Sequence, residues 1–373
     1  MTTSLMTTVN NAVHQERLRR AQEEMANQNV DLLVVGPSPD LFYLIGYEGH
    51  ESERMSVLVL PRDGQASYVV PRLEAALLDG KEDLLTLVTW TETEQPASVL
   101  AGIAGAAADG TIAVNDDLWS VFLLRLQAAL PNARWVEAAP LLRPLRMRKD
   151  ATEVATMAEV ARLTDETWEE FIRQPVAGLT ELEAKDRLEA ALKARGVKPA
   201  FCIIASGPHS ASPHHGAGER VIQEGDALVV DWGGTLGGYY SDVTRSAHVG
   251  PASEAYQAAY AAVLKANEIA FAAVRPGVPC EDIDRAAREY LTANGYGEAF
   301  FHRVGHGLGL AVHEEPYLVA GNDLPLAEGM TFSDEPGVYF PGAFGIRIED
   351  TVVVTADGGE KLNHATRALA ILT

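Results

Sequence analysis

A basic segment rich in helix breakers divides this chain of 373 residues into two parts with different patterns. The segment includes Pro140 and Pro144 and ends at Lys149. Directly after it, Asp150 stands three residues before Glu153, a spacing typical of a helix start. Single hydrophobic cores stop growing near about 250–300 residues, so a chain of this length is expected to divide. We therefore predict two domains, residues 1–142 and 143–373, with the crossing within residues 140–148.

The first part alternates short apolar runs with helical patterns. Strands are predicted at residues 31–35, 56–60, 67–70, 84–89, 111–114 and 135–137, and helices at residues 15–28, near residue 75 and at residues 118–130. This rhythm predicts a small α/β domain with a mixed sheet.

The second part repeats a different order, in which a helix pair is followed by strands. Helices are predicted at residues 152–173, 180–195, 254–274 and 280–294, and strands at residues 201–205, 226–231 and 239–249 and within the β-rich stretch 302–372. Thr180 and Glu183 form a capping-box pattern at the second helix. The order predicts an α+β fold and hints at two similar halves.

Charge and cysteine content exclude several function classes. The chain has 30 Lys and Arg against 52 Asp and Glu, a net charge of −22, which disfavours nucleic acid and anionic membranes as partners. Its apolar runs fall short of the ~20 residues that cross a bilayer. Cys202 and Cys280 make neither a disulfide framework nor a zinc knuckle, and the first twenty residues show no secretory leader pattern. We expect a soluble cytoplasmic protein.

Two aspartates flank a predicted hairpin whose turn lies at residues 236–238. If Leu236 faces Gly237, Asp231 lies directly opposite Asp242. Such a pair has Cβ atoms only ~4.5–5.5 Å apart, and like charges at that distance repel. A divalent cation held by oxygen ligands would neutralise them. Two solvated turn aspartates are an equally good interpretation of the hairpin alone.

Three of the ten histidines, His302, His306 and His313, fall within twelve residues, among glycines that allow close approach of the backbone. This pattern indicates a metal or proton-transfer role. A phosphate-binding loop is disfavoured, because the glycines lack the strand–turn–helix setting and the later acidic residue. A zinc-binding HExxH helix is disfavoured too, because Pro316 follows His313-Glu-Glu.

Further carboxylates stand in strand-like settings near the C-terminus. Glu335 follows residues 331–334, and strand alternation places Arg347 and Glu349 on one face and Asp350 on the other. Each alone would be ordinary surface decoration. The combined set is four carboxylates and one imidazole: Asp231, Asp242, His306, Glu335 and Glu349. Two divalent cations would balance four carboxylates and activate a water near neutral pH, which predicts a two-metal hydrolase site.

At these residues the chain resembles the pita-bread metallopeptidases, the family of aminopeptidase P, prolidase and methionine aminopeptidase. The resemblance covers roughly residues 147–373 and is carried by Asp242-Val-Thr-Arg, His306-Gly-Leu-Gly, His313-Glu-Glu-Pro, Glu335-Pro-Gly and Arg347-Ile-Glu349-Asp. The N-terminal third resembles the creatinase-like domain that accompanies prolidase and aminopeptidase P. The implied architecture is α+β, a pita-bread domain preceded by a smaller α/β creatinase-like domain. Creatinase itself works without metal, and the complete set of metal ligands in this chain argues against a creatinase.

The resemblance implies a role for each matching residue. One metal would be held by Asp231 and Asp242, and the second by Asp242, His306, Glu335 and Glu349, with Asp242 and Glu349 bridging. Glu335 would also act as the general base. His214 would lie near the scissile carbonyl, His302 and His313 would cradle the proline and the oxyanion, and Arg347 would support the cluster and the product carboxylate. His215 is assigned no role.

The resemblance also implies substrate contacts, and here the chain departs from the family. Phe201 stands where many members have a tyrosine whose hydroxyl is proposed to assist catalysis. Another donor, such as His214 or a water, then does its work, or the hydroxyl is dispensable. Tyr47, His50 and Arg54 lie in a loop that reaches the partner's active site in family dimers. A homodimer is therefore expected, although a solvated turn is an equally good interpretation of this loop.

The function that follows is hydrolysis of the imide bond in Xaa-Pro dipeptides, as in prolidase. The chain is short for aminopeptidase P, and its His-Gly-Leu-Gly-Leu motif is that of prolidases. An Xaa-Pro aminopeptidase acting on longer peptides is the main alternative; a non-catalytic binding protein would lack a ligand, and a phosphotriester-splitting side activity stays open. Oxygen-dominated ligands favour two Mn²⁺ ions, for which Co²⁺ or Zn²⁺ could substitute.

Overall fold

The computed structural model describes residues 11–373, so the first half of the segment without a leader pattern lies outside the described residues. The chain forms two compact units that divide between Arg146 and Met147. Within residues 11–373, no helix is both long and apolar enough to cross a membrane.

The N-terminal unit is built on a six-stranded mixed sheet with the strand order β4-β3-β2-β1-β5-β6. The strands are β1 (Leu32–Val35), β2 (Val57–Pro61), β3 (Ala66–Pro71), β4 (Leu85–Trp90), β5 (Thr111–Val114) and β6 (Arg134–Glu137). The helices are α1 (Asn11–Asn27), α2 (Pro39–Ile45), α3 (Pro96–Ile103), α4 (Ser120–Ala129) and α5 (Ala139–Met147), with 3-10 helices at Arg72–Leu78 and Gly105–Asp109.

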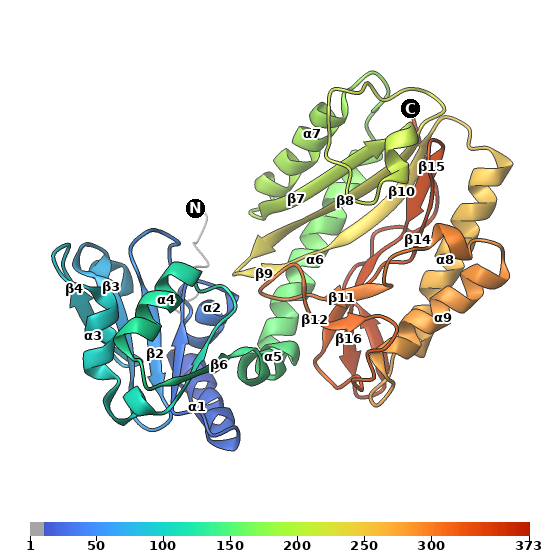
Figure 1. The fold of residues 1–373 in the computed structure, drawn as a ribbon. Helices are drawn as coiled ribbons and strands as arrows, with labels where there is room; N and C mark the ends of the chain where they lie inside the picture. Colours follow the sequence, from blue (N-terminus) through green and yellow to red (C-terminus); the bar gives the residue numbers. More distant parts are fainter. Residues whose placement is uncertain (1–10) are drawn as a thin grey trace. The chain divides into compact units, whose positions relative to one another are not determined.

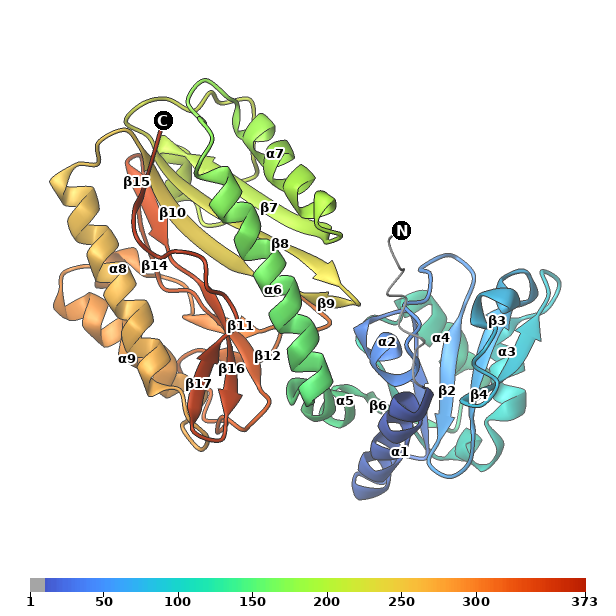
Figure 2. The ribbon, with the colours of Figure 1, turned by 180° about the vertical axis from the view of Figure 1, so that it is seen from behind.

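Helices cover both faces of this sheet (Figures 1 and 2). Val34 packs with Leu100 of α3 and Leu126 of α4 in one core, while its neighbour Leu33, which points to the opposite face, is also fully buried. Strands covered on both faces read as continuous apolar runs, which is the pattern of residues 32–35. The expected α/β character of this part is confirmed.

The C-terminal unit contains two larger sheets, each with its own helix pair (Figure 1). In the first half, α6 (Ala151–Phe171) and α7 (Glu181–Ala194) pack on a sheet with the order β18-β10-β8-β7, in which β9 also pairs with β8. Its strands are β7 (Lys198–Ser206), β8 (Ala227–Leu236), β9 (Tyr239–Tyr240), β10 (Val243–Val249) and β18 (Ala370–Leu372), and a 3-10 helix, η3 (Gly207–Ala211), follows β7. Both helices begin with the predicted capping boxes.

In the second half, α8 (Glu254–Ala273) and α9 (Cys280–Ala293) pack on a sheet with the order β12-β11-β13-β16-β17. Its strands are β11 (Gly305–Gly307), β12 (Glu314–Leu318), β13 (Thr331–Asp334), β16 (Asp350–Thr355) and β17 (Gly358–Lys361). A separate hairpin pairs β14 (Gly337–Phe340) with β15 (Phe344–Arg347), and a short 3-10 helix, η4 (Gly297–Ala299), precedes β11. The two halves thus share an order of helix pair and sheet, and the expected α+β fold is confirmed.

The β8–β9 turn corrects one prediction from the sequence. Leu236 pairs with Tyr239, so Gly237 and Gly238 form a two-residue turn between them. Their φ angles are 58° and 86°, a left-handed pair that favours glycine and suits the twist of a tight hairpin. The assumption that Leu236 faces Gly237 was therefore wrong.

This turn changes the partner of Asp231 but not its face. Asp231 pairs with Thr244, and Val243 pairs with Trp232, so Asp242 falls beside Gly233 rather than opposite Asp231. The register differs from the expected one by an even number of residues, and side chains alternate with a period of two. Asp231 and Asp242 therefore stay on the same face as diagonal neighbours.

Candidate metal centre and active site

One cavity of about 810 Å³ in the C-terminal unit gathers the site residues predicted for that part of the chain. They are Phe201, His214, Asp231, Asp242, His302, His306, His313, Glu335, Arg347 and Glu349. The three remaining predicted residues, Tyr47, His50 and Arg54, lie in the N-terminal unit.

Strands of both sheets, and residues directly next to strands, supply the five residues predicted to bind metal. Asp231 lies within β8, and Asp242 comes directly before β10. His306 is the middle residue of β11, Glu335 follows β13, and Glu349 precedes β16. The backbone N–H of Glu349 donates to the carbonyl of Thr244 at 3.1 Å, which ties the second sheet to the first beside the cavity.

The donor atoms of this group lie close together. His306 Nε2 is 3.3 Å from Glu335 Oε1 and 3.7 Å from Asp242 Oδ2. Donor atoms of Asp242, His306 and Glu349 all lie within 4.8 Å of one another, and the three residues are buried. Separations of this size suit shared coordination of a cation.

Two carboxylates in the cavity are each bonded through one oxygen only. Arg347 Nη2 donates to Asp231 Oδ2 at 2.6 Å, and Thr244 Oγ1 donates to Glu349 Oε2 at 2.5 Å. The other oxygens, Asp231 Oδ1 and Glu349 Oε1, are buried and have no hydrogen-bond partner among residues 11–373. Buried polar atoms without partners are rare and costly, and oxygen ligands of this kind suit hard divalent cations. The residues present therefore fit a divalent metal centre.

Electrostatics point the same way. Burial, reinforced by the neighbouring carboxylates, raises the pKa values of Asp242 and Glu349 well above the ordinary range. Burial likewise raises the pKa of Glu335 to about 7. Burial and the adjacent His313 lower the pKa of His306 to about 3, which keeps its imidazole neutral with a lone pair for a metal. Bound cations would offset the repulsion among the carboxylates.

These pKa shifts predict proton release on metal binding. At pH 6 the raised carboxyl groups are partly protonated and must ionise to bind, whereas His306 is already neutral. Raising the pH from 6 to 8 passes the pKa of Glu335, so the protons that Glu335 itself releases on Mn²⁺ binding should fall by about one per chain. Calorimetric titration of metal-free wild type and Glu335→Gln, in buffers of different ionisation enthalpy, measures this number as the difference in proton release between the two proteins. An equal difference at both pH values would contradict the prediction.

The three other predicted histidines line the cavity in different ways. His302 Nδ1 lies 2.7 Å from the carbonyl of Arg303, its buried Nε2 has no partner among the described residues, and burial lowers its pKa to about 4. The ring of His313 contacts that of His306 with centroids 4.1 Å apart, and burial lowers its pKa. His214 lies in the loop after η3. Neutral His302 and His313 are suited to donate or accept hydrogen bonds.

Arg347 is buried, and four of the five N–H groups of its guanidinium donate hydrogen bonds within the protein. Besides Asp231, it donates to Thr244 Oγ1 at 3.0 Å, to the Tyr339 hydroxyl at 2.7 Å and to the carbonyl of Pro213 at 3.2 Å. It therefore holds the carboxylate of Asp231 in place and ties it to Thr244, Tyr339 and the backbone of Pro213. Neither Tyr339 nor Thr244 was predicted as a site residue. Thr244 stands inside the Asp242-Val-Thr-Arg motif, which could have identified it, whereas no sequence signal marks Tyr339.

Phe201 presents an aromatic ring where many family members have a hydroxyl. A Cβ added at Gly233 would lie 2.7 Å from that ring and 2.1 Å from the carbonyl oxygen of Ser241, so the ring packs where only glycine fits. In the N-terminal unit, Tyr47 packs edge-on against Tyr68, and Arg54 pairs with Glu92 at 2.9 Å. A role of the N-terminal loop in substrate binding stays a prediction.

This fold and site define a class of protein. Residues 155–356 match the model of metallopeptidase family M24, and residues 17–148 match that of the creatinase/prolidase N-terminal domain. The chain belongs to metallopeptidase family M24 and carries the creatinase/prolidase N-terminal domain. The resemblance and the pita-bread architecture inferred from the sequence are confirmed.

Individual relatives match along nearly the whole chain. The probable dipeptidase PepE of Mycobacterium tuberculosis is 41% identical over 365 residues, covering 96% of this chain and 97% of the relative. The crystal structure of dipeptidase PepE from Mycobacterium ulcerans is 42% identical, with a TM-score of 0.93 over 97% of this chain and 99% of the other. A prolidase structure from Thermococcus sibiricus is 33% identical, with a TM-score of 0.90 over 95% and 98%.

Proposed function

We propose that this protein is a cytoplasmic dipeptidase that hydrolyses the imide bond of Xaa-Pro dipeptides with two divalent metal ions, most favourably Mn²⁺. The observation that carries the proposal is the buried group of four carboxylates and one imidazole, two of whose oxygens have no partner among the described residues. Support for the substrate comes from relatives named as dipeptidases and a prolidase.

The proposed ligand division is the one implied by the family. Asp231 and Asp242 would hold one ion, and Asp242, His306, Glu335 and Glu349 would hold the second. When bound, the ions would lower the pKa of a shared water toward ~7 and polarise the scissile carbonyl. Oxygen donors outnumber nitrogen donors four to one in this set, which favours Mn²⁺ over Zn²⁺.

The side chains around the ligands perform the remaining steps in this proposal. Glu335 takes the proton of the attacking water and passes it to the proline nitrogen, which has no hydrogen of its own. His214, His302 and His313 surround the scissile carbonyl and hold the proline and the oxyanion through hydrogen bonds. Arg347 keeps Asp231 and the backbone of Pro213 in place through the bonds described above.

Selectivity for a dipeptide needs a positively charged side chain that can pair with the free carboxylate of the substrate. Arg347 already donates four hydrogen bonds within the protein, whereas Arg303 lines the same cavity and makes no hydrogen bond or ion pair through its guanidinium among residues 11–373. It stacks on the ring of Tyr317 at 4.3 Å. We therefore assign the carboxylate of the dipeptide to Arg303.

Replacing Arg303 by glutamine should raise KM for Ala-Pro by about 10-fold or more, because a charge-assisted hydrogen bond of about 1.5–3 kcal/mol is lost. The KM for the amide Ala-Pro-NH₂, which has no carboxylate, should change little. Steady-state kinetics on both substrates checks this. Equal changes for the two substrates would remove Arg303 from carboxylate binding.

The function itself is tested by comparing Ala-Pro with Ala-Pro-Ala on protein of measured manganese content. Rapid cleavage of the dipeptide and little action on the tripeptide is the expected result. The reverse preference would identify an Xaa-Pro aminopeptidase instead. Failure to cleave either peptide with two metal ions bound would point to a binding protein. The homodimer, in which the partner's Tyr47, His50 and Arg54 loop closes the site, is part of this proposal and is checked by sedimentation.

A further inference from the structure

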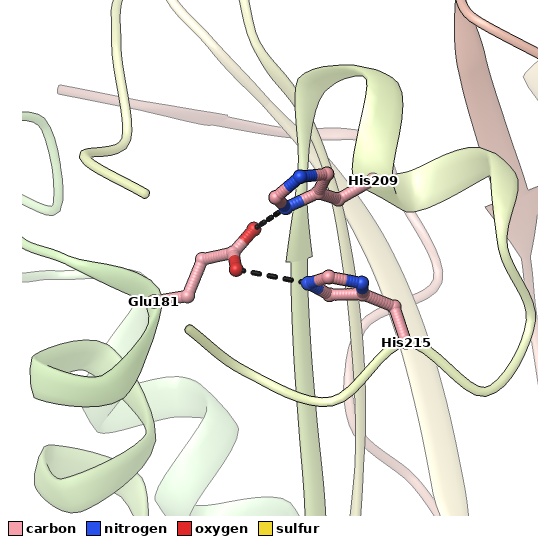
Figure 3. A group of neighbouring side chains, drawn as sticks. All are labelled: Glu181, His209 and His215. Carbon is pink, nitrogen blue, oxygen red and sulfur yellow. Dashed lines mark hydrogen bonds and ion pairs between the residues drawn. The ribbon is translucent and has the colours of Figure 1, made fainter. Parts of the chain in front are cut away.

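A second group of side chains that could hold a metal ion lies outside the residues that line the cavity. Glu181, the first residue of α7, faces His209 of η3 and His215 from the following loop (Figure 3). His209 Nδ1 is 3.0 Å from Glu181 Oε1, and His215 Nε2 is 3.0 Å from Glu181 Oε2. The imidazole centroids are 4.1 Å apart. Donor atoms of all three residues lie within 4.8 Å of one another.

The carboxylate at the centre of this group also accepts hydrogen bonds from residues other than the two histidines. Glu181 Oε1 accepts from the backbone N–H of Ser206 at 2.9 Å and from its hydroxyl at 2.7 Å. Glu181 Oε2 accepts from the N–H of Gly218 at 3.1 Å. Arg220 in turn donates to the hydroxyl of Ser206 at 2.5 Å. Such outer partners are the ones that orient a carboxylate ligand of a metal.

The carboxylate of this group is buried while its two imidazoles are partly exposed, an arrangement that suits an ion site. The side chain of Glu181 is fully buried, whereas those of His209 and His215 are 41% and 22% exposed. Burial alone would raise the pKa of Glu181, but hydrogen bonds from Ser206 and from both imidazoles outweigh it and lower the pKa. An ionised carboxylate therefore stands below two imidazoles that solvent can reach. A cation can replace the two ring protons without displacing the backbone donors.

We propose that Glu181, His209 and His215 form a third cation site, separate from the two proposed in the cavity. Two imidazoles and one carboxylate suit Zn²⁺, with one coordination position left for water. The oxygen-rich cavity set has the opposite bias. The Glu181 site and the cavity would thus bind different ions from a mixture of Zn²⁺ and Mn²⁺.

The site lies on the segment that carries His214. Residues 207–218 comprise η3 and the loop that follows it. In this loop, Pro213 and His215 flank His214, and the carbonyl of Pro213 accepts a hydrogen bond from Arg347. An ion held by these three residues of the proposed site would join two points of this segment, His209 and His215, to Glu181 at the start of α7. It would fix the position of His214, a consequence that rests on the proposed function, whereas ion binding itself does not.

The test counts zinc ions in protein variants. Equilibrium dialysis of the metal-free wild type against Zn²⁺ should find one more bound ion per chain than dialysis of His209→Ala or His215→Ala. The matched control is His364→Ala, an exposed histidine of the same unit, which should bind as many ions as the wild type. The difference of one ion is expected whatever the cavity binds, so it is independent of the peptidase assignment.

Two further measurements separate an ion site from a hydrogen-bonded anchor. Ser206→Ala removes a hydrogen bond to the carboxylate and should weaken Zn²⁺ binding at this site by about 10- to 100-fold. With Mn²⁺ in the cavity, added Zn²⁺ should slow amide hydrogen exchange in residues 207–218 of the wild type but not of His209→Ala. Equal zinc counts in wild type and both histidine variants would overturn the site. An extra ion without slower exchange would overturn its effect on the His214 segment.

Discussion

The substitution Asp242→Asn should lower kcat for Ala-Pro by about 10³-fold, because loss of a metal ion removes several kcal/mol of transition-state stabilisation. Asp242 is the proposed bridging ligand, and its Oδ2 lies 3.7 Å from His306 Nε2. Metal content should fall from two ions to one or none. The metal-free variant should nevertheless melt at the same temperature as the metal-free wild type or higher, since burial and carboxylate neighbours disfavour the charge that Asp242→Asn removes.

The control for this variant is Asp165→Asn, a buried carboxylate of the same unit that does not line the cavity. Asp165 accepts hydrogen bonds from Asn363 and from the backbone of His364, so its replacement should lower the melting temperature while leaving metal content near that of the wild type. Full turnover by Asp242→Asn with two ions bound would disprove the assignment of Asp242 as a bridging ligand.

Glu335→Gln is the second change with a large expected effect, a loss of about 10²–10⁴ in kcat from the missing proton transfer. The amide keeps one oxygen for a metal but cannot carry a proton. The loss should appear in kcat with little change in KM, because the proton moves only in the reaction step. Stopped-assay kinetics on Ala-Pro with metal analysis of the same sample measures both.

Glu328→Gln, an exposed change in the same unit, serves as the comparison and should leave kcat unchanged. If Glu335→Gln lost both metals but regained full kcat in excess Mn²⁺, Glu335 would be a ligand only. The proton would then be carried by another group.

The fold was predictable to a large extent because its local signals agree with one another. The helix pairs of the C-terminal part were predicted close to where the structure has them, and the capping boxes at Asp150 and Thr180 mark two helix starts that the structure confirms. Register was not predictable from the same signals. The sequence allows either a turn that contains both Gly237 and Gly238 or a register in which Gly237 pairs with Leu236. The structure shows the first arrangement, because Leu236 pairs with Tyr239.

The site shows a similar division between what motifs reveal and what packing decides. Ten predicted residues line one cavity, and most of them stand in short motifs. Tyr339, which bonds Arg347, and the Glu181 group depend on contacts between segments that are distant in the sequence. Glu181 is 28 residues from His209 and 34 from His215, and a glutamate at a helix start is usually no more than a cap.

The placement of the five proposed ligands on two different sheets has a consequence for how the enzyme is assembled. Asp231 and Asp242 come from the first half, and His306, Glu335 and Glu349 come from the second. Neither half holds enough donors to retain the pair of ions by itself. The bound ions would thus cross-link the two halves. Both ions can bind only when the two halves have reached their native arrangement.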